Sequence, residues 1–146
     1  MSVPNILNIL LLHQNWFARE LRARGHQVIV ASYNQDADIH LNGPGISIGS
    51  ILDKCPARMR PNRLVYFDDS YPVSIVGLES VAIPSLFYAI DTHHHLSWHR
   101  FFARIFDAVW VAHLDYLEAM RTENANTEWV PLWAPVVLTP SFPKAI

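Results

Sequence analysis

The chain has 146 residues, of which 51% are hydrophobic and 16% are charged, and its formal net charge is -2 with histidine neutral. This length supports one domain with a proper core, and the composition excludes a disordered chain. The weak negative charge and the lack of a basic run exclude the electrostatic footprint of a nucleic-acid-binding protein. Cys55 is the only cysteine, so the sequence also excludes an intrachain disulfide and a cysteine-based zinc site.

Targeting signals are missing from the sequence as given. Its apolar runs are too short to span a bilayer, so we expect no transmembrane segment. The first residues, MSVPNILNILLLHQ, lack the basic region of a signal peptide. We therefore expect a cytoplasmic protein.

The first quarter of the chain predicts strand, helix and strand. The apolar run 6–12 is typical of a parallel strand that is buried on both faces. A helix is expected over 15–24, because Gly25 stands where a helix C-terminus favours glycine. A second strand is expected over 26–31, and the polar, turn-rich residues 34–45 predict a loop.

A second helix is predicted over 47–55, with Ser47 as its N-cap. Cys55 shares the apolar stripe of that helix, which indicates a core thiol and not a reactive one. The run 63–67 predicts the third strand. A short helix is expected over 72–81, because a proline stands near its first turn.

The rest of the chain repeats the alternation. We expect strands over 85–90 and 108–112, helices over 96–106 and 114–124, and a short strand or extended exit over 128–133. The helix over 96–106 carries an apolar stripe that we expect to face the core, formed by Trp98, Phe101, Phe102 and Ile105.

This alternation of strand and helix predicts an α/β fold. We expect a Rossmann-like three-layer sandwich with a mostly parallel sheet of five to six strands, joined by right-handed crossovers. Residues 1–131 would form this domain.

Ligands of such sheets bind outside the carboxyl ends of the strands, near the point where strand order reverses. Polar and titratable residues follow four of the predicted strands, so we expect them to gather at one edge of the sheet. They are His13 and Asn15 after the first strand, Asp68, Asp69 and Ser70 after the third, Asp91, Thr92, His93 and His94 after the fourth, and His113 after the fifth.

The turn after the first strand, LLHQNWF, contains no glycine. A dinucleotide or a Walker-type phosphate loop needs glycine there for the tight turn and for close approach of the phosphates. We therefore expect no cofactor in this chain.

The run His93-His94-His95 raises the possibility of a metal. With Asp91 it offers nitrogen and oxygen ligands, and His95 and His99 would lie one turn apart on a helix. Adjacent histidines on an extended loop point in different directions, however, and no distant ligand motif completes a site. We predict no metal, and we keep a metal-binding protein or metal-dependent hydrolase as an alternative.

Four stretches give the chain a resemblance to a known family. They are NILLLHQNWFARELRARGHQV, GLESVAIPSLFYAIDTHHH, FDAVWVAHLDYLEAMR and TEWVPLWAP. Their strand and turn patterns resemble the N-terminal, acceptor-side domain of glycosyltransferases with two Rossmann-like domains, the GT-B architecture. The spore-maturation-like glycosyltransferases are the subgroup that the chain resembles.

The resemblance implies that this chain binds a sugar-containing or other hydroxyl acceptor and supplies the general base. Asp91 and His93 would be the first candidates for that base and His13 the next, and the other strand-end residues would bind the acceptor. A nucleotide-sugar donor would bind a C-terminal domain, and residues 132–146 would be the linker toward that missing domain. This chain alone would then be inactive. A non-catalytic Rossmann-like interaction domain is the third hypothesis.

Overall fold

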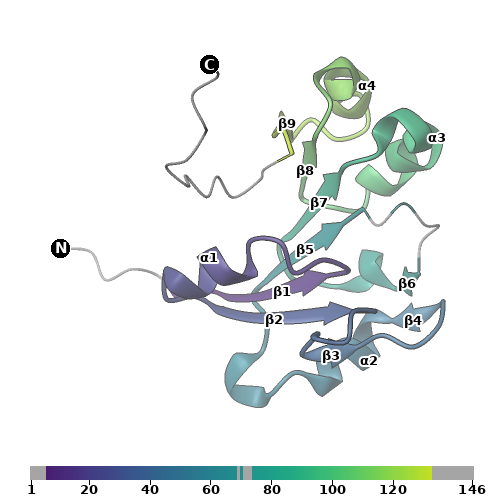
Figure 1. Ribbon diagram of the computed structural model, residues 1–146. Helices are drawn as coiled ribbons and strands as arrows, with labels where there is room; N and C mark the ends of the chain where they lie inside the picture. Colours follow the sequence, from purple (N-terminus) through teal and green to yellow (C-terminus); the bar gives the residue numbers. More distant parts are fainter. Residues whose placement is uncertain (1–5, 69, 71–73, 133–146) are drawn as a thin grey trace, which may run out of the picture.

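The computed structural model describes residues 6–68, 70 and 74–132 (Figure 1). The strands of the main sheet are β1 (Asn8–Leu12), β2 (Gln27–Ser32), β3 (Ile39–His40), β5 (Arg63–Phe67), β7 (Ser85–Ala89), β8 (Ala108–Val111) and β9 (Thr127–Trp129). A small second sheet pairs β4 (Ile46–Ser47) with β6 (Ile75–Val76). The α-helices are α1 (Ala18–Ala23), α2 (Ile48–Lys54), α3 (Thr92–Ala103) and α4 (Leu117–Arg121). Short 3-10 turns cover Ala57–Met59, Leu78–Ser80 and Leu114–Tyr116.

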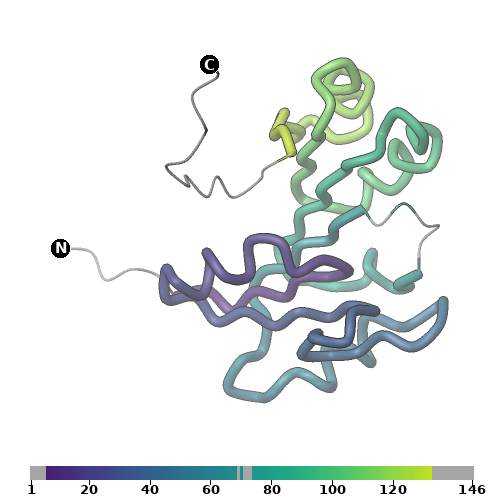
Figure 2. The backbone as a smooth tube through the Cα atoms, in the orientation of Figure 1, coloured from purple at the N-terminus to yellow at the C-terminus, as the bar shows by residue number. Residues whose placement is uncertain are grey.

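The described part of the main sheet has seven strands in the order β3-β2-β1-β5-β7-β8-β9, and every pair is parallel. From β1 the chain first builds outward through β2 to β3, and then it returns to place β5 on the other side of β1. Figure 2 shows this as purple and blue strands on one side and green strands on the other. Strand order therefore reverses between β1 and β5, as in the Rossmann arrangement.

Side chains alternate between two layers of core, because successive residues of a strand point to opposite faces. Leu10 and Tyr66 point to the face that α2, α3 and α4 cover. Leu11 and Phe67 point to the opposite face, where α1 packs through Ala18. The α/β fold class and the three layers predicted from the sequence are thus confirmed, with one or two more strands than expected.

Several local predictions are also confirmed. The Ser47 hydroxyl caps α2 by accepting the Gly49 N–H at 3.1 Å. Gly25 follows α1 in the left-handed region, with φ +89°. Cys55 is half-buried and packs against the core on the α2 side of the sheet.

Two predicted elements are wrong. In the range predicted as a helix over 72–81, the described residues Ile75 and Val76 form β6 and pair with β4. Gly77 follows with φ +83°, a conformation that no helix continues, so only one 3-10 turn forms after it. The predicted loop over 34–45 contains β3, a two-residue strand that adds an edge to the main sheet beside β2.

Helix α3 also differs from its prediction. It begins at Thr92, four residues before the predicted start, and it is kinked at His95, whose φ is -124°. Phe102 is buried as expected, but Phe101 is 66% exposed. Within the described residues, no helix has the length and apolar character that crossing a membrane requires. The predicted linker over 132–146 lies outside the described residues except for Leu132.

Candidate functional site

The carboxyl ends of β1, β5, β7 and β8 form one continuous edge, because these strands are parallel neighbours or near neighbours in the sheet. His13 and Asp68 directly follow β1 and β5. Asp91 and His113 each stand two residues after the ends of β7 and β8. Residues that are far apart in sequence therefore share this edge, as the sequence predicted. Asp69 lies outside the described residues.

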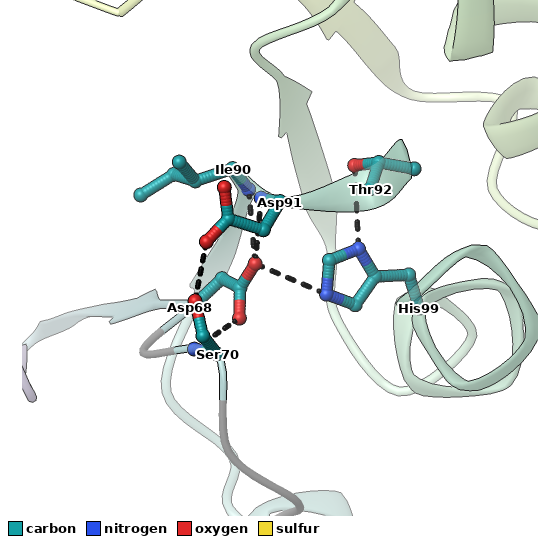
Figure 3. Close-up of polar contacts among 6 residues, drawn as sticks. All are labelled: Asp68, Ser70, Ile90, Asp91, Thr92 and His99. Carbon is teal, nitrogen blue, oxygen red and sulfur yellow. Dashed lines mark hydrogen bonds and ion pairs between the residues drawn. The ribbon is translucent and has the colours of Figure 1, made fainter. Parts of the chain in front are cut away.

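Asp68 is the centre of this edge and is buried, with 3% of its surface exposed. Its Oδ2 accepts the N–H groups of Asp91 at 2.8 Å and Ile90 at 3.3 Å, and its Oδ1 accepts the N–H of Ser70 at 2.9 Å. His99 Nε2 lies 3.2 Å from the same Oδ2. We call Asp68, Ser70, Ile90, Asp91, Thr92 and His99 the Asp68 cluster (Figure 3).

The Asp68 cluster keeps the central carboxylate ionised. Burial alone would raise the pKa of Asp68, since it removes the charge from water. The interactions with His99 and the N–H donors of Asp91 and Ser70 outweigh burial and lower the pKa of Asp68 to about 2. At neutral pH the cluster therefore contains a buried negative charge that accepts hydrogen bonds only.

Asp91 is half-buried, and Ser70 holds its side chain. The Ser70 hydroxyl donates to Asp91 Oδ2, and Ser70 itself adopts a left-handed backbone with φ +63°. Asp91 stands at the N-cap position of α3, but its side chain makes no capping hydrogen bond. Its carboxylate instead points toward Ser70, in the segment that follows β5 (Figure 3).

His13 lies beneath the same edge and is 3% exposed. Its backbone is left-handed, with φ +75°, and is held on both sides of the residue: its N–H donates to Ala31 O at 2.8 Å, and its carbonyl accepts the Ser32 hydroxyl at 2.6 Å. The imidazole stacks on Tyr33, and its Nε2 lies 3.3 Å from Ser74 Oγ. Burial lowers the pKa of His13 to about 4, although the charge of Asp68 acts in the opposite direction. The ring is therefore neutral at pH 7.

The rings of His93, His94 and His113 lie close together at this edge, in tilted and edge-to-face arrangements. The centroid of the His93 ring lies 3.8 Å from that of His94 and 4.9 Å from that of His113. His93 thus joins the start of α3 to the end of β8. His95 and His99 rings are 5.8 Å apart, as expected for residues one turn apart. However, the described residues contain no group of three or more histidine, cysteine, aspartate or glutamate side chains that could hold a metal ion.

Two residues that the sequence places in the binding set behave differently. Thr92 is fully buried, and its hydroxyl lies 3.2 Å from His99 Nδ1, so it supports the edge from below. Asn15 donates to Asp36 Oδ2 at 3.4 Å and thereby contacts the segment after β2. The remaining candidates of that set lie along the edge itself, except for Asp69, whose position is not described.

Sequence reasoning missed His99 as a member of the site. It lies two helical turns after Thr92, and the sequence suggested it only as a partner of His95 in the alternative metal site. The imidazole is fully buried, but it contacts the Asp68 carboxylate as well as the Phe87 ring. Its carboxylate partner, Asp68, directly follows β5 and stands 31 residues earlier in the sequence, so no local pattern could reveal the pair.

A large apolar groove lies away from this edge. Its volume is about 840 Å³, and it opens on the α1 face of the sheet between Phe17, Leu86, Trp110 and Val130. It also includes Arg63, Ser85 and Ala108, the first residues of β5, β7 and β8. The groove therefore extends to the amino ends of these strands, whereas the polar side chains lie beyond their carboxyl ends.

The chain was compared with known proteins at three levels. No protein-family model, no curated protein and no solved structure matches it, so the geometry and chemistry of the site carry the functional argument.

Proposed function

We propose that the carboxyl edge of this sheet binds a hydroxyl acceptor and that the chain is the acceptor-binding half of a glycosyltransferase. The observation that carries this proposal is the Asp91 carboxylate. It stands at the strand-end edge, its backbone N–H is fixed by the buried charge of Asp68, and its side chain is held by Ser70. A carboxylate held in this way can accept a hydrogen bond, and then a proton, from a sugar hydroxyl.

In this mechanism the acceptor hydroxyl lies against Asp91 or the exposed His93. One of the two removes the hydroxyl proton while the acceptor oxygen attacks the anomeric carbon of the donor sugar. The bond from that carbon to the nucleotide breaks as the new glycosidic bond forms, and the nucleotide leaves with the electron pair. The nucleotide-sugar would be bound by a further domain, at a site that this chain does not supply.

His13 ranks behind Asp91 and His93 as the general base. A base must come within hydrogen-bond reach of the acceptor hydroxyl, whereas the His13 ring is covered by Tyr33. A pKa of about 4 also makes it a weak proton acceptor at neutral pH. We therefore expect the neutral, buried ring of His13 to pack beneath the acceptor site without taking part in proton transfer.

Acceptor binding can be tested on this chain alone. A panel of mono- and disaccharides is added to the 15N-labelled protein, and amide shifts are followed. We expect shifts at Ser70, Asp91 and His113, and none at Arg63 or Ser85 on the amino edge. Shifts confined to the amino edge, or no shifts with any saccharide, would contradict the proposal.

Transfer is measured in a protein that carries this chain together with a donor-binding domain. Because general-base catalysis contributes about 10²- to 10⁴-fold, the double variant Asp91→Ala/His93→Ala is expected to lower the transfer rate by at least about 100-fold. Asp53→Ala, which removes an exposed carboxylate near the end of α2, is the matched control and should leave the rate unchanged. An unchanged rate in the double variant would exclude both residues as the base.

A further inference from the structure

His99 has the surroundings of a functional residue although it does not reach the surface. It is fully buried in the middle of α3, with 0% of its surface exposed. One ring nitrogen, Nε2, lies 3.2 Å from Asp68 Oδ2, and the other, Nδ1, lies 3.2 Å from Thr92 Oγ1. The imidazole thus bridges the end of β5 and the start of its own helix (Figure 3).

The protons of the Asp68 cluster can be assigned from its chemistry. The Asp68 carboxylate is ionised, so it can only accept. His99 Nε2 must therefore carry a hydrogen, since otherwise two acceptors would face each other at 3.2 Å. In the neutral ring Nδ1 is then an acceptor, and the Thr92 hydroxyl donates to it.

The oxygen that faces His99, Asp68 Oδ2, also accepts hydrogen bonds from the backbone at the carboxyl edge of the sheet. Asp68 Oδ2 accepts the N–H groups of Ile90 and Asp91, which lead from β7 into α3. If His99 lost its N–H, this buried carboxylate would lose one of its donors. It would then bind a proton more readily or turn away from the two amides. Either change would weaken the two hydrogen bonds that hold the Ile90 and Asp91 amides.

We propose that His99 is a positioning residue for the acceptor edge. Through Asp68 it holds the turn that carries Asp91 and His93, without contacting the acceptor itself. This role rests on the proposed function only for its effect on acceptor binding. The structural part of the role, that His99 orders the 90–91 turn through Asp68, stands independently.

The test compares two substitutions of similar volume in the full chain. His99→Gln keeps an N–H donor that can reach Asp68, whereas His99→Leu keeps only apolar bulk. Loss of a hydrogen bond to a buried charge changes a local opening equilibrium by about 10-fold or more. We expect His99→Leu to speed hydrogen exchange of the Ile90 and Asp91 amides at least about 10-fold more than that of Leu10 in β1. His99→Gln should restore most of the protection.

Equal acceleration at Ile90, Asp91 and Leu10 in His99→Leu would overturn the proposal, because the histidine would then contribute only to the core. So would identical exchange in the two variants. If His99→Leu does not fold, hydrogen exchange in His99→Gln and the 15N shifts of the wild-type His99 ring still test the role. The 15N shifts of the His99 ring must show hydrogen on Nε2, and a neutral ring with hydrogen on Nδ1 alone would also refute the role.

The same variants separate this inference from the proposed function. If wild-type protein binds a saccharide, we expect His99→Leu to weaken that binding at least about 10-fold and His99→Gln to weaken it by less than about 3-fold, on the same reasoning. Equal binding by all three proteins would refute the positioning role at the acceptor site. If no saccharide binds to the wild type, the proposed function fails, while the exchange measurements still decide whether His99 orders the turn.

Discussion

The buried ring of His13 predicts how the stability of this protein depends on pH. In the unfolded chain the imidazole has its ordinary pKa of 6.5, and in the folded protein burial lowers the pKa to about 4. Above pH 6.5 the ring is neutral in both states. Between pH 6.5 and 4 the unfolded chain binds a proton that the folded protein does not, so the free energy of unfolding falls as pH falls.

The size of this effect follows from the two pKa values. The difference between 6.5 and about 4 corresponds to about 3 kcal/mol, since each tenfold change in proton affinity equals about 1.4 kcal/mol. That is a large fraction of the 5–15 kcal/mol that is typical of small domains, on the order of a fifth or more. Acidification to about pH 4 should therefore destabilise the protein markedly.

Urea unfolding between pH 7.5 and 4 measures the effect, with His13→Asn as the comparison. Asparagine tolerates the left-handed backbone that position 13 requires, but it does not titrate. The stability of the wild type should fall by about 3 kcal/mol more than that of the variant over this range. A parallel decline in both proteins, or a His13 ring resonance that titrates near pH 6.5, would refute the reasoning.

Three further predictions follow. Asp68→Asn should lower the free energy of unfolding at pH 7 by about 2 kcal/mol, because the pKa of Asp68 is lowered from 3.8 to about 2 in the folded protein. The difference between variant and wild type should be constant above pH 4 and should shrink as pH falls toward 2. Urea unfolding at several pH values measures it. Gly77→Ala should destabilise by about 1 kcal/mol in thermal unfolding, because φ at this position is +83° and a side chain is strained there. Burial raises the pKa of the Cys55 thiol, so Cys55 should react with a disulfide reagent at pH 8 more slowly than free glutathione, and at the ordinary rate once urea unfolds the chain.

The sequence predicted the fold well where apolar runs were long and uninterrupted. The uninterrupted apolar runs around Leu10 and Val109 predicted buried strands, as observed. The alternation of these strands with helices predicted the parallel sheet. The helix predicted over 72–81 is wrong, because a proline near the start of a range permits a helix but does not require one, and Ile75 and Val76 are β-branched. Those two residues and the following Gly77 favour a short strand and a turn.

The site could be predicted only in outline. A parallel sheet brings all strand ends to one edge, so the shared location of His13, Asp68 and Asp91 followed from topology alone. Burial at that edge did not follow, because it depends on which side chains cover each residue in three dimensions. Asp68 and His13 lie beneath the surface, while Asp91 and His93 remain accessible, and the sequence does not distinguish these cases.

The buried charge of Asp68 has a consequence for how the sheet assembles. Two of its N–H donors, Ile90 and Asp91, lie in the turn between β7 and α3, and they reach Asp68 when Phe67 pairs with Tyr88 as observed. A shift of one residue in the register of β5 and β7 would turn the side chains of one strand to the opposite face of the sheet. It would also separate the ionised Asp68 carboxylate from its N–H donors. We therefore expect Asp68 to select the correct register of β5 and β7 during folding, because a misaligned sheet would contain an unpaired buried charge and would be unstable.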